Sequence, residues 1–374
     1  MRILLFEDYS GLHTFLAKGL RELGHEVVTV GNGNMFHNLP RDIDIRRRDC
    51  GRLTGLRHWV HMVRLLPRFR GFDIVQLINP DAFGLKPQRE YFFYHFLKRH
   101  NRRLLVGAFG ADWHWTDDGL HHKTFRYGDF YIGNRMRTDE AAQQFVREYD
   151  GTEKGRYCKY VMEDCDAIPA CLYEYKAVYA HYLPEKTTFI PLPMLVEHDR
   201  PVHTFGGLPL RVFIGIDKKR SEYKGTDIMW RALCHVAERH PQEIEVVKAE
   251  SLPFDEYSKA MNGCDVMLDQ LYAYTPSMNS LLAMQKGIIV VGGGEPEGYD
   301  LLGERELRPI VNVEPTFESV VDALEQLIAH PERIAPLKQQ SIDYVKKHHD
   351  YRKVAVAYEA LYKTVLGSRR QFRP

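Results

Sequence analysis

The chain has 374 residues, 44% hydrophobic and 27% charged, a size and composition that suit two globular domains. Its 51 basic and 50 acidic residues leave a formal net charge of +1, which gives no general attraction for nucleic acid. The six cysteines form no C-x-x-C pair, which argues against a zinc site and fits a reducing cytoplasm. We therefore expect a cytoplasmic protein with no signal peptide, no membrane-spanning segment and no bound metal.

The first half of the sequence alternates short apolar runs with helical patterns, beginning with a helix predicted at Leu12–Leu23. Strands are predicted at Ile3–Phe6, Glu26–Val30, Asp73–Leu77 and Arg103–Phe109. This alternation predicts a parallel sheet with helices on both faces. The loop after the first strand contains Ser10-Gly11 and no G-x-G-x-x-G, which disfavours a dinucleotide-dependent oxidoreductase.

Residues Arg41–Arg70 hold nine arginines and three acids, a local net charge of +6. Apolar residues recur among them at helical spacing. This pattern is typical of a helix lying on an anionic membrane, where a lipid-linked acceptor would be found. It equally fits a helix that packs on the core and has an arginine-rich solvent face, so both interpretations stay open.

A proline- and glycine-rich stretch predicts a domain boundary near Val202. The second domain is predicted to begin with a strand at Leu210–Ile216. A basic turn follows and precedes a helix at Thr226–Arg239; the cations of this turn are Lys218, Lys219, Arg220 and Lys224.

The stretch Asp265–Tyr299 is predicted to fold as strand, helix, strand and glycine-rich loop. The strands are Val266–Leu268 and Ile288–Val291, and Thr275 and Pro276 have the residue types of a helix start. The free amides of the first helical turn, near Ser277–Ser280, would lie at the carboxyl ends of the strands. Such a place suits a phosphate group.

This stretch resembles the donor-binding segment of retaining glycosyltransferases of the group 1, family four type, which have the GT-B fold. In that family the segment reads roughly E-x-F-G-x-x-L-L-E-A-M-A-x-G-x-P-V-V, followed by G-G-x-P-E. Here Leu282-Ala283-Met284-Gln285-Lys286-Gly287 and the strand after it fit the second half, and Gly293-Gly294-Glu295-Pro296-Glu297 fits the final motif. The two family glutamates fall on Tyr274 and Leu282, so both are replaced.

The resemblance implies that the chain takes a nucleotide-sugar, UDP- or GDP-linked, as its donor substrate and uses no separate cofactor. Lys224 and one of Lys218, Lys219 and Arg220 would hold the donor diphosphate. The same phosphates would accept hydrogen bonds at the helix start, from Ser277, Met278, Asn279 and Ser280. Fixed cations stabilise a nucleoside diphosphate leaving group and could replace a metal ion. Glu295 and Glu297 could bind sugar or ribose hydroxyls, or could be ordinary acids at a helix start.

In the first domain, the resemblance places the Glu7–Gly11 loop, with Gly11, against the transferred sugar or the acceptor. A simple turn after the strand is the alternative. The sequence Gly110-Ala111-Asp112-Trp113-His114-Trp115 matches the family loop whose histidine touches the donor sugar. His114 and Asp112 are therefore the predicted catalytic residues, with packing in the core as the alternative.

Together these patterns predict an α/β protein with two Rossmann-like, doubly wound domains facing across a cleft, residues 1–202 and 203–350, and a closing helix in residues 351–374 that returns to the first domain. The predicted activity is retaining transfer of a hexosyl group to a hydroxyl of a glycan or lipid-linked acceptor, in synthesis of surface glycans or other glycoconjugates. A nucleotide-sugar epimerase of the same fold and a non-catalytic nucleotide- or partner-binding protein are the alternatives.

Overall fold

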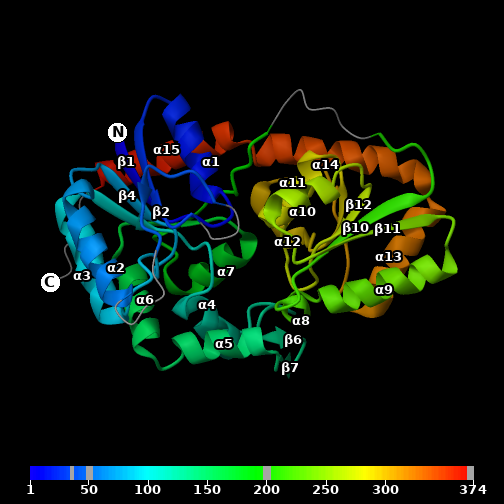
Figure 1. Cartoon of the computed structure of the whole chain (residues 1–374), viewed down its shortest axis with the longest axis horizontal. Helices are drawn as coiled ribbons and strands as arrows, with labels where there is room; N and C mark the ends of the chain where they lie inside the picture. The colour runs from blue at the N-terminus through cyan, green and yellow to red at the C-terminus, as the bar shows by residue number, and fades with distance from the viewer. Residues whose placement is uncertain (34–37, 48–53, 197–203, 369–374) are drawn as a thin grey trace. The chain divides into compact units, whose positions relative to one another are not determined.

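A computed structural model describes residues 1–33, 38–47, 54–196 and 204–368 (Figure 1). It divides into two compact units. Unit 1 comprises Met1–Thr124, Phe145–Pro193 and Tyr351–Pro374, and unit 2 comprises Phe125–Gln144 and Met194–Asp350. The predicted boundary at Val202 lies outside the described residues. The structure also shows a feature with no counterpart in the predicted division: Phe125–Gln144 groups with the second half of the chain.

Unit 1 is built on a parallel sheet of five strands in the order β3-β2-β1-β4-β5. Its strands are β1 (Arg2–Phe6), β2 (Glu26–Gly31), β3 (Ile43–Asp44), β4 (Ile74–Leu77) and β5 (Arg103–Val106). The parallel pair β8 (Ile168–Ala170) and β9 (Thr187–Phe189) continues beside β5 through isolated bridges. The chain moves outward from β1 to β2 and β3 and then returns to place β4 on the other side of β1, so the switch point of this sheet lies between β1 and β4. Open α/β sheets bind ligands at such a point.

The helices of unit 1 follow the expected alternation. They are α1 (Leu12–Glu22), α2 (Thr54–Leu65), α3 (Pro87–His100), α4 (Trp113–Asp117), α6 (Glu153–Asp164), α7 (Tyr173–Tyr182) and α15 (Tyr351–Gly367), with short helical turns at Leu66–Arg68 and Asp118–His122. Helix α5 (Glu140–Tyr149) begins in unit 2 and ends in unit 1. Among the residues that the structure describes, no helix combines the length and apolar character needed to cross a bilayer.

The C-terminal helix α15 packs along α1, which confirms that the closing helix returns to the first domain (Figure 1). Gly19 permits this close approach. A Cβ at position 19 would lie 2.6 Å from Ala355 Cβ and 2.7 Å from the Tyr351 carbonyl oxygen. The Tyr362 hydroxyl also donates to Gln76 Oε1 at 2.9 Å, which ties α15 to the buried centre of β4.

Unit 2 has a second parallel sheet of five strands, in the order β11-β10-β12-β13-β14. The strands are β10 (Leu210–Ile216), β11 (Ile244–Glu250), β12 (Val266–Leu268), β13 (Ile289–Gly292) and β14 (Val311–Asn312). The chain moves from β10 outward to β11 and then returns to place β12 on the other side of β10. The switch point of this sheet therefore lies between β10 and β12.

The helices of unit 2 are α8 (Ser221–Lys224), α9 (Thr226–Arg239), α10 (Phe254–Ala260), α11 (Met278–Gln285), α12 (Pro296–Leu302), α13 (Phe317–Ala329) and α14 (Ile334–His348), with a short turn at Pro331–Arg333. A small antiparallel hairpin, β6 (Tyr131–Ile132) and β7 (Arg135–Met136), completes the unit. Helices α9 and α13 pack against each other, and α11 packs against α14.

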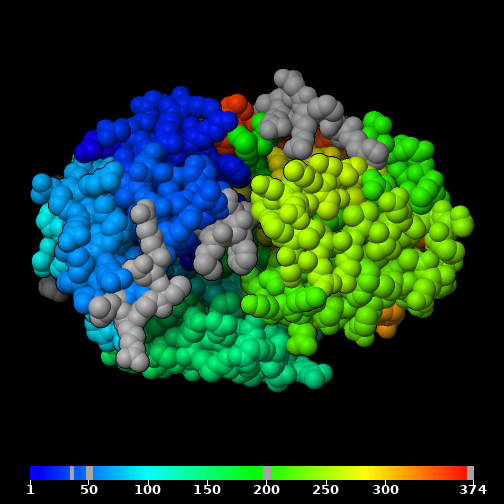
Figure 2. All heavy atoms as spheres, in the orientation of Figure 1, coloured from blue at the N-terminus to red at the C-terminus, as the bar shows by residue number. Residues whose placement is uncertain are grey.

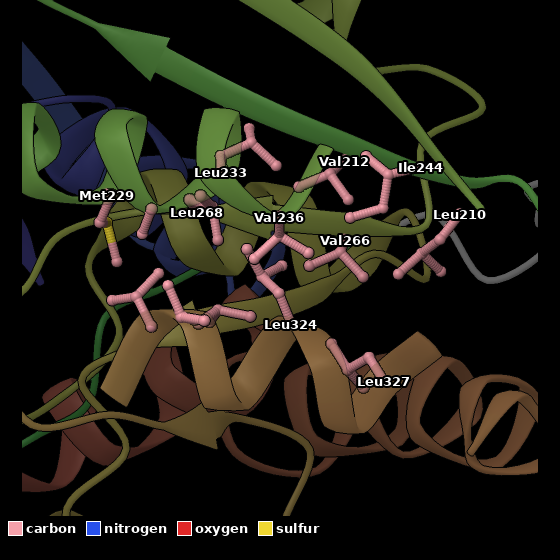
Figure 3. Close-up of a cluster of buried hydrophobic side chains, with 14 of the residues drawn as sticks. Leu210, Val212, Met229, Leu233, Val236, Ile244, Val266, Leu268, Leu324 and Leu327 are labelled. Atoms are coloured by element: carbon pink, nitrogen blue, oxygen red, sulfur yellow. The ribbon is translucent and has the colours of Figure 1, made fainter. Parts of the chain in front are cut away.

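A continuous apolar core holds α9 and α13 against the sheet (Figure 3). Side chains of α9, such as Leu233 and Val236, and of α13, such as Leu324, point toward residues of β10 and β12. These side chains are fully buried. Burial of each contributes about 1.5–3 kcal/mol, so this layer fixes the strand ends from which the loops of the predicted site emerge.

Candidate functional site

The predicted diphosphate ligands lie in two loops that flank the switch point of unit 2. One loop follows β10 and carries Lys218–Lys224; the other follows β12 and leads into α11. The two loops touch, because the Leu271 amide donates to the Lys224 carbonyl at 2.9 Å. Gly225 has φ +72°, and a Cβ there would lie 2.9 Å from Leu271 Cβ. The glycine of the Lys-Gly pair is thus required by the contact between the two loops.

The four cations of the first loop have different surroundings. Lys218 forms an ion pair with Glu250 at the end of β11, which also pairs with Lys248 at 2.6 Å. The Arg220 guanidinium lies 5.0 Å from the ring centre of Tyr223. Lys219 is exposed, and its amide donates to Asp217. Lys224 ends α8 and is half-buried.

The helix predicted to bind phosphate begins later than the sequence suggests. Thr275 and Pro276 were expected to start it, but α11 begins at Met278, with Ser277 in the N-cap position. Thr275 instead packs against the start of α12, where a Cβ at Gly298 would lie 2.4 Å from Thr275 Cγ2. The backbone amides of the first turn of a helix have no carbonyl acceptors within the helix. The amides of residues 278–280 are therefore directed out of the amino end of α11.

Two side chains of α11 tie this first turn to the end of β12. Asn279 Nδ2 donates to Asp269 Oδ1 at 3.0 Å and to the Tyr257 hydroxyl at 3.0 Å. The Ser280 hydroxyl donates to Asp269 Oδ2. The side chains of Asn279 and Ser280 therefore position the helix start. Their backbone amides are still directed out of the amino end of α11, where the predicted phosphate would lie.

The glycine-rich loop after β13 presents two acids that are already paired. Glu295 is 4% exposed, and its Oε2 lies 2.6 Å from Arg126 Nη2. Glu297 Oε1 lies 2.7 Å from Arg126 Nη1. The Tyr127 hydroxyl donates to Glu295 Oε1, and burial together with this bond raises the pKa of Tyr127. The hydrogen bond to Glu297 raises the pKa of Arg126, which stays charged.

Tyr274 stands where the family has its first glutamate and takes part in the same cluster. Its hydroxyl accepts a hydrogen bond from the Arg126 amide at 2.8 Å, and its ring packs against the rings of Phe125 and Tyr127. Leu282, at the second glutamate position, lies in α11. Neither position provides a carboxylate for a ribose.

In unit 1, Asp112 and His114 are both only 1% exposed. Asp112 caps α4, since its Oδ1 accepts the Trp115 amide at 3.0 Å, and its Oδ2 accepts the Tyr179 hydroxyl. His114 lies among the rings of Trp113, Tyr179 and Tyr182. Burial lowers the pKa of His114, and its Nδ1 lies 4.0 Å from Asp112 Oδ2 and has no hydrogen-bond partner within the described part of the chain. The expected open loop is thus a capped helical turn, and the catalytic roles of both residues stay predictions.

Gly11 precedes α1 and has φ +93°. Its amide donates to Asp8 Oδ1 at 3.1 Å, and the same carboxylate accepts the amides of His13 and Thr14. The amino end of α1 is therefore capped by a side chain from its own loop. A contact of Gly11 with sugar or acceptor stays a prediction. The Gly11 amide could not donate to the ligand in that contact, because it already donates to Asp8.

Sequence reasoning missed Arg126, Tyr127 and Arg137, which reach the site from the first half of the sequence. Arg137 is 6% exposed and donates from Nη2 to the carbonyls of Glu222 at 3.0 Å and Tyr223 at 2.9 Å. It also lines an open pocket of about 370 Å³, together with Asp139, Tyr272 and others. The aromatic-rich composition of the sequence around residue 127 is the signal that could have pointed to this segment. In the described ranges, no three His, Cys, Asp or Glu side chains are grouped to hold a metal ion.

The sequence matches no model of a known protein family and no curated protein. The structure is similar to sucrose-phosphate synthase from Thermosynechococcus elongatus, with TM-score 0.62, 11% identity and 99% and 100% of the two chains covered. It is also similar to Anabaena HepE in complex with UDP and glucose, with TM-score 0.60, 13% identity and 97% and 100% covered.

The chain has the GT-B fold. A third structure shares this arrangement, a protein from Listeria monocytogenes described as a UDP-N-acetylglucosamine 2-epimerase. It has TM-score 0.57, 10% identity, and 99% of this chain and 97% of that chain are covered. The GT-B fold thus confirms the predicted pair of Rossmann-like domains, while identities this low say nothing by themselves about activity.

Proposed function

We propose that the protein is a GT-B glycosyltransferase that moves a sugar from a nucleotide-sugar to an acceptor hydroxyl. The observation that carries this proposal is the contact between the Lys224 loop and the loop leading to α11, at the switch point of unit 2. A diphosphate there would meet the Lys224 cation and the amino end of α11. Support also comes from HepE, a similar structure that is described with UDP and with glucose.

In the proposed reaction the bond between the sugar and the diphosphate breaks, and the leaving diphosphate gains negative charge. The acceptor oxygen forms the new bond to the sugar, and its proton passes to the leaving diphosphate. Lys224, with Lys219 or Arg220, stabilises that charge electrostatically, so that no metal ion is needed. Lys218 is the weaker choice because it is already paired with Glu250. We further propose a UDP- or GDP-linked hexose donor, retention at the sugar, a role in glycan or glycoconjugate synthesis, and a glycan or lipid-linked acceptor.

Thermal unfolding with UDP, GDP and ADP tests the proposal. One of these nucleotides should raise the melting temperature of the wild-type protein. Lys224→Ala should reduce the shift strongly, whereas Lys259→Ala, which removes an exposed lysine of α10, should leave it unchanged. If no nucleotide stabilises the wild-type protein, the chain is better described as a non-catalytic member of the fold.

A nucleotide-sugar epimerase is the second candidate, and one observation favours it. Glu7, at the carboxyl end of β1, is a buried carboxyl group whose pKa is raised to about 7 by burial. An acid or base that titrates near neutral pH is what epimerisation requires. Incubation with the preferred nucleotide-sugar and no acceptor separates the two: an epimerase returns an isomeric nucleotide-sugar, and a transferase does not.

Contact of Arg41–Arg70 with an anionic membrane stays a prediction. Helix α2 lies at the surface of unit 1 (Figure 2) and exposes half of Leu56, while it buries His58 and Met62. Arg48 lies outside the described residues. Binding to anionic vesicles that is lost when Arg46, Arg47 and Arg48 are replaced would support the contact; binding that survives these changes would argue against it.

A further inference from the structure

The segment Phe125–Gln144, here called the strap, belongs to unit 2 by its contacts. The chain immediately before it and after it belongs to unit 1. The strap contains the β6–β7 hairpin and ends in the first turn of α5. Two of its arginines, Arg126 and Arg137, contact the loops that carry the predicted donor ligands.

At the glycine-rich loop the strap provides the charge partner of two acids. Arg126 uses one guanidinium nitrogen for Glu295 and another for Glu297, at 2.6 and 2.7 Å. Glu295 is almost fully buried, and a buried carboxylate without a partner would be costly. The position of the loop therefore depends on Arg126.

At the Lys224 loop the strap fixes the backbone. Arg137 Nη2 donates to the carbonyls of Glu222 and Tyr223, the residues just before Lys224. The Arg137 guanidinium also lies 4.0 Å from the ring centre of Tyr272, in the loop that leads toward α11. The strap thus holds both loops of the predicted diphosphate site.

Glu297 retains an unused acceptor. Its Oε1 binds Arg126, but its Oε2 is buried and has no hydrogen-bond partner among the described residues. A sugar hydroxyl is a donor that suits such a carboxylate oxygen. An acid held in place by Arg126 can therefore serve as an acceptor for a hydroxyl of the transferred sugar.

We propose that the strap completes the donor site and that its two arginines have separate roles. Arg126 is a positioning residue that holds Glu295 and Glu297 for the hydroxyls of the transferred sugar. Arg137 is a positioning residue that holds the Lys224 loop for the diphosphate. This assignment rests on the proposed function, because it requires a nucleotide-sugar in unit 2.

The test compares dissociation constants for a nucleotide-sugar and for the matching free nucleoside diphosphate, measured by calorimetry on the full chain. Arg126→Ala should raise the constant for the nucleotide-sugar about tenfold, the loss expected for a charged hydrogen bond, and change that for the free nucleotide less than twofold. Arg137→Ala should raise the dissociation constants of both ligands by the same factor. Arg231→Ala, which removes an exposed arginine of α9 in the same unit, should change neither.

Further variants separate positioning from general loss of structure. Arg126→Lys keeps the charge but cannot bridge two carboxylates in the same way, so it should show the same selective loss with a smaller loss of thermal stability than Arg126→Ala. Glu297→Gln should give a similar loss, and the double variant Arg126→Ala/Glu297→Gln should be little worse than either change alone.

The outcomes are distinct. If the wild-type protein binds neither ligand, the proposed function fails and this inference fails with it. If the wild-type protein binds both ligands but Arg126→Ala and Arg126→Lys leave the ratio of the two constants unchanged, the role of the strap is overturned and the proposed function stands.

Discussion

Asn279 Nδ2 lies 3.0 Å from Asp269 Oδ1, and this contact joins the first turn of α11 to the end of β12. Ser280 donates to the other oxygen of the same carboxylate. Asp269 is 7% exposed, so its charge is compensated mainly by these donors. One carboxylate therefore determines where the amino end of α11 is directed, and with it the amides of the proposed diphosphate site.

The first prediction concerns this carboxylate. Asp269→Ala removes the acceptor for one buried donor, Ser280, and one half-buried donor, Asn279, and should lower the free energy of unfolding by about 1–3 kcal/mol. It should also weaken nucleoside diphosphate binding, because the helix start is no longer held. Chemical unfolding and calorimetry measure the two effects. Asp255→Ala, at an exposed position of α10, is the control and should change neither quantity. Unchanged nucleotide affinity in Asp269→Ala would show that the α11 start does not bind the phosphates.

The sequence predicted the strands of unit 2 well because they are uninterrupted apolar runs. Val266–Leu268 and Ile289–Gly292 are buried along their whole length, as expected of parallel strands covered on both faces. The helix start was placed wrongly because Thr275 and Ser277 both belong to residue types found at N-caps. The choice between them depends on tertiary contacts at Asp269 and Gly298, which no local pattern contains.

The pairing of Arg126 with Glu295 could not have been predicted in this way. The two residues are 169 positions apart, and an arginine in an aromatic-rich segment has many possible partners. At Asp112 the structure differs from the prediction for another reason. The resemblance predicts Asp112 as a catalytic residue in a loop, although Asp is also a common N-cap, and here it caps α4.

The second prediction concerns the packing of the closing helix. Gly19→Ala should lower the free energy of unfolding by about 1–3 kcal/mol, because the added Cβ would meet Ala355 and the Tyr351 carbonyl at less than 3 Å. Alanine is otherwise the better helix former. The matched control is Gly55→Ala in α2, where a Cβ would meet nothing within 4 Å, and this change should raise stability by up to about 1 kcal/mol. Equal effects at the two sites would contradict the close packing of α1 on α15.

The third prediction concerns a buried ion pair in unit 2. Lys338 Nζ lies 2.9 Å from Asp265 Oδ1, and both side chains are less than 5% exposed. Lys338→Met leaves a buried carboxylate without its cation and should cost about 3–5 kcal/mol in unfolding free energy. Asp265→Asn in the same chain should recover part of that loss. Arg239→Met breaks the more exposed pair with Glu325 and should cost less than about 1 kcal/mol. A comparably small loss for Lys338→Met would mean that water reaches Asp265.

The last prediction concerns pH and Glu7. Burial raises the pKa of Glu7 from 4.5 to about 7 in the folded protein, while the Asn32 amide donates to its Oε2 and partly opposes this shift. Between these two pH values the folded state keeps a proton that the unfolded state has lost, so the contribution of Glu7 to stability falls as pH rises. A shift of this size corresponds to at most about 3 kcal/mol. Glu7→Gln removes the titration and keeps an acceptor for Asn32.

Denaturant unfolding at several pH values measures this effect. The stability of Glu7→Gln relative to the wild-type protein should increase as the pH rises from 4.5 through the folded-state pKa of about 7, and become constant about one pH unit above that pKa. Glu256→Gln, at an exposed position of α10, should give a difference that does not change over this range. If the Glu7→Gln difference is also constant with pH, Glu7 is ionised in the folded protein throughout. The raised pKa of Glu7, which favours an epimerase, would then be contradicted, and the glycosyltransferase would remain the only proposed activity with a supporting observation.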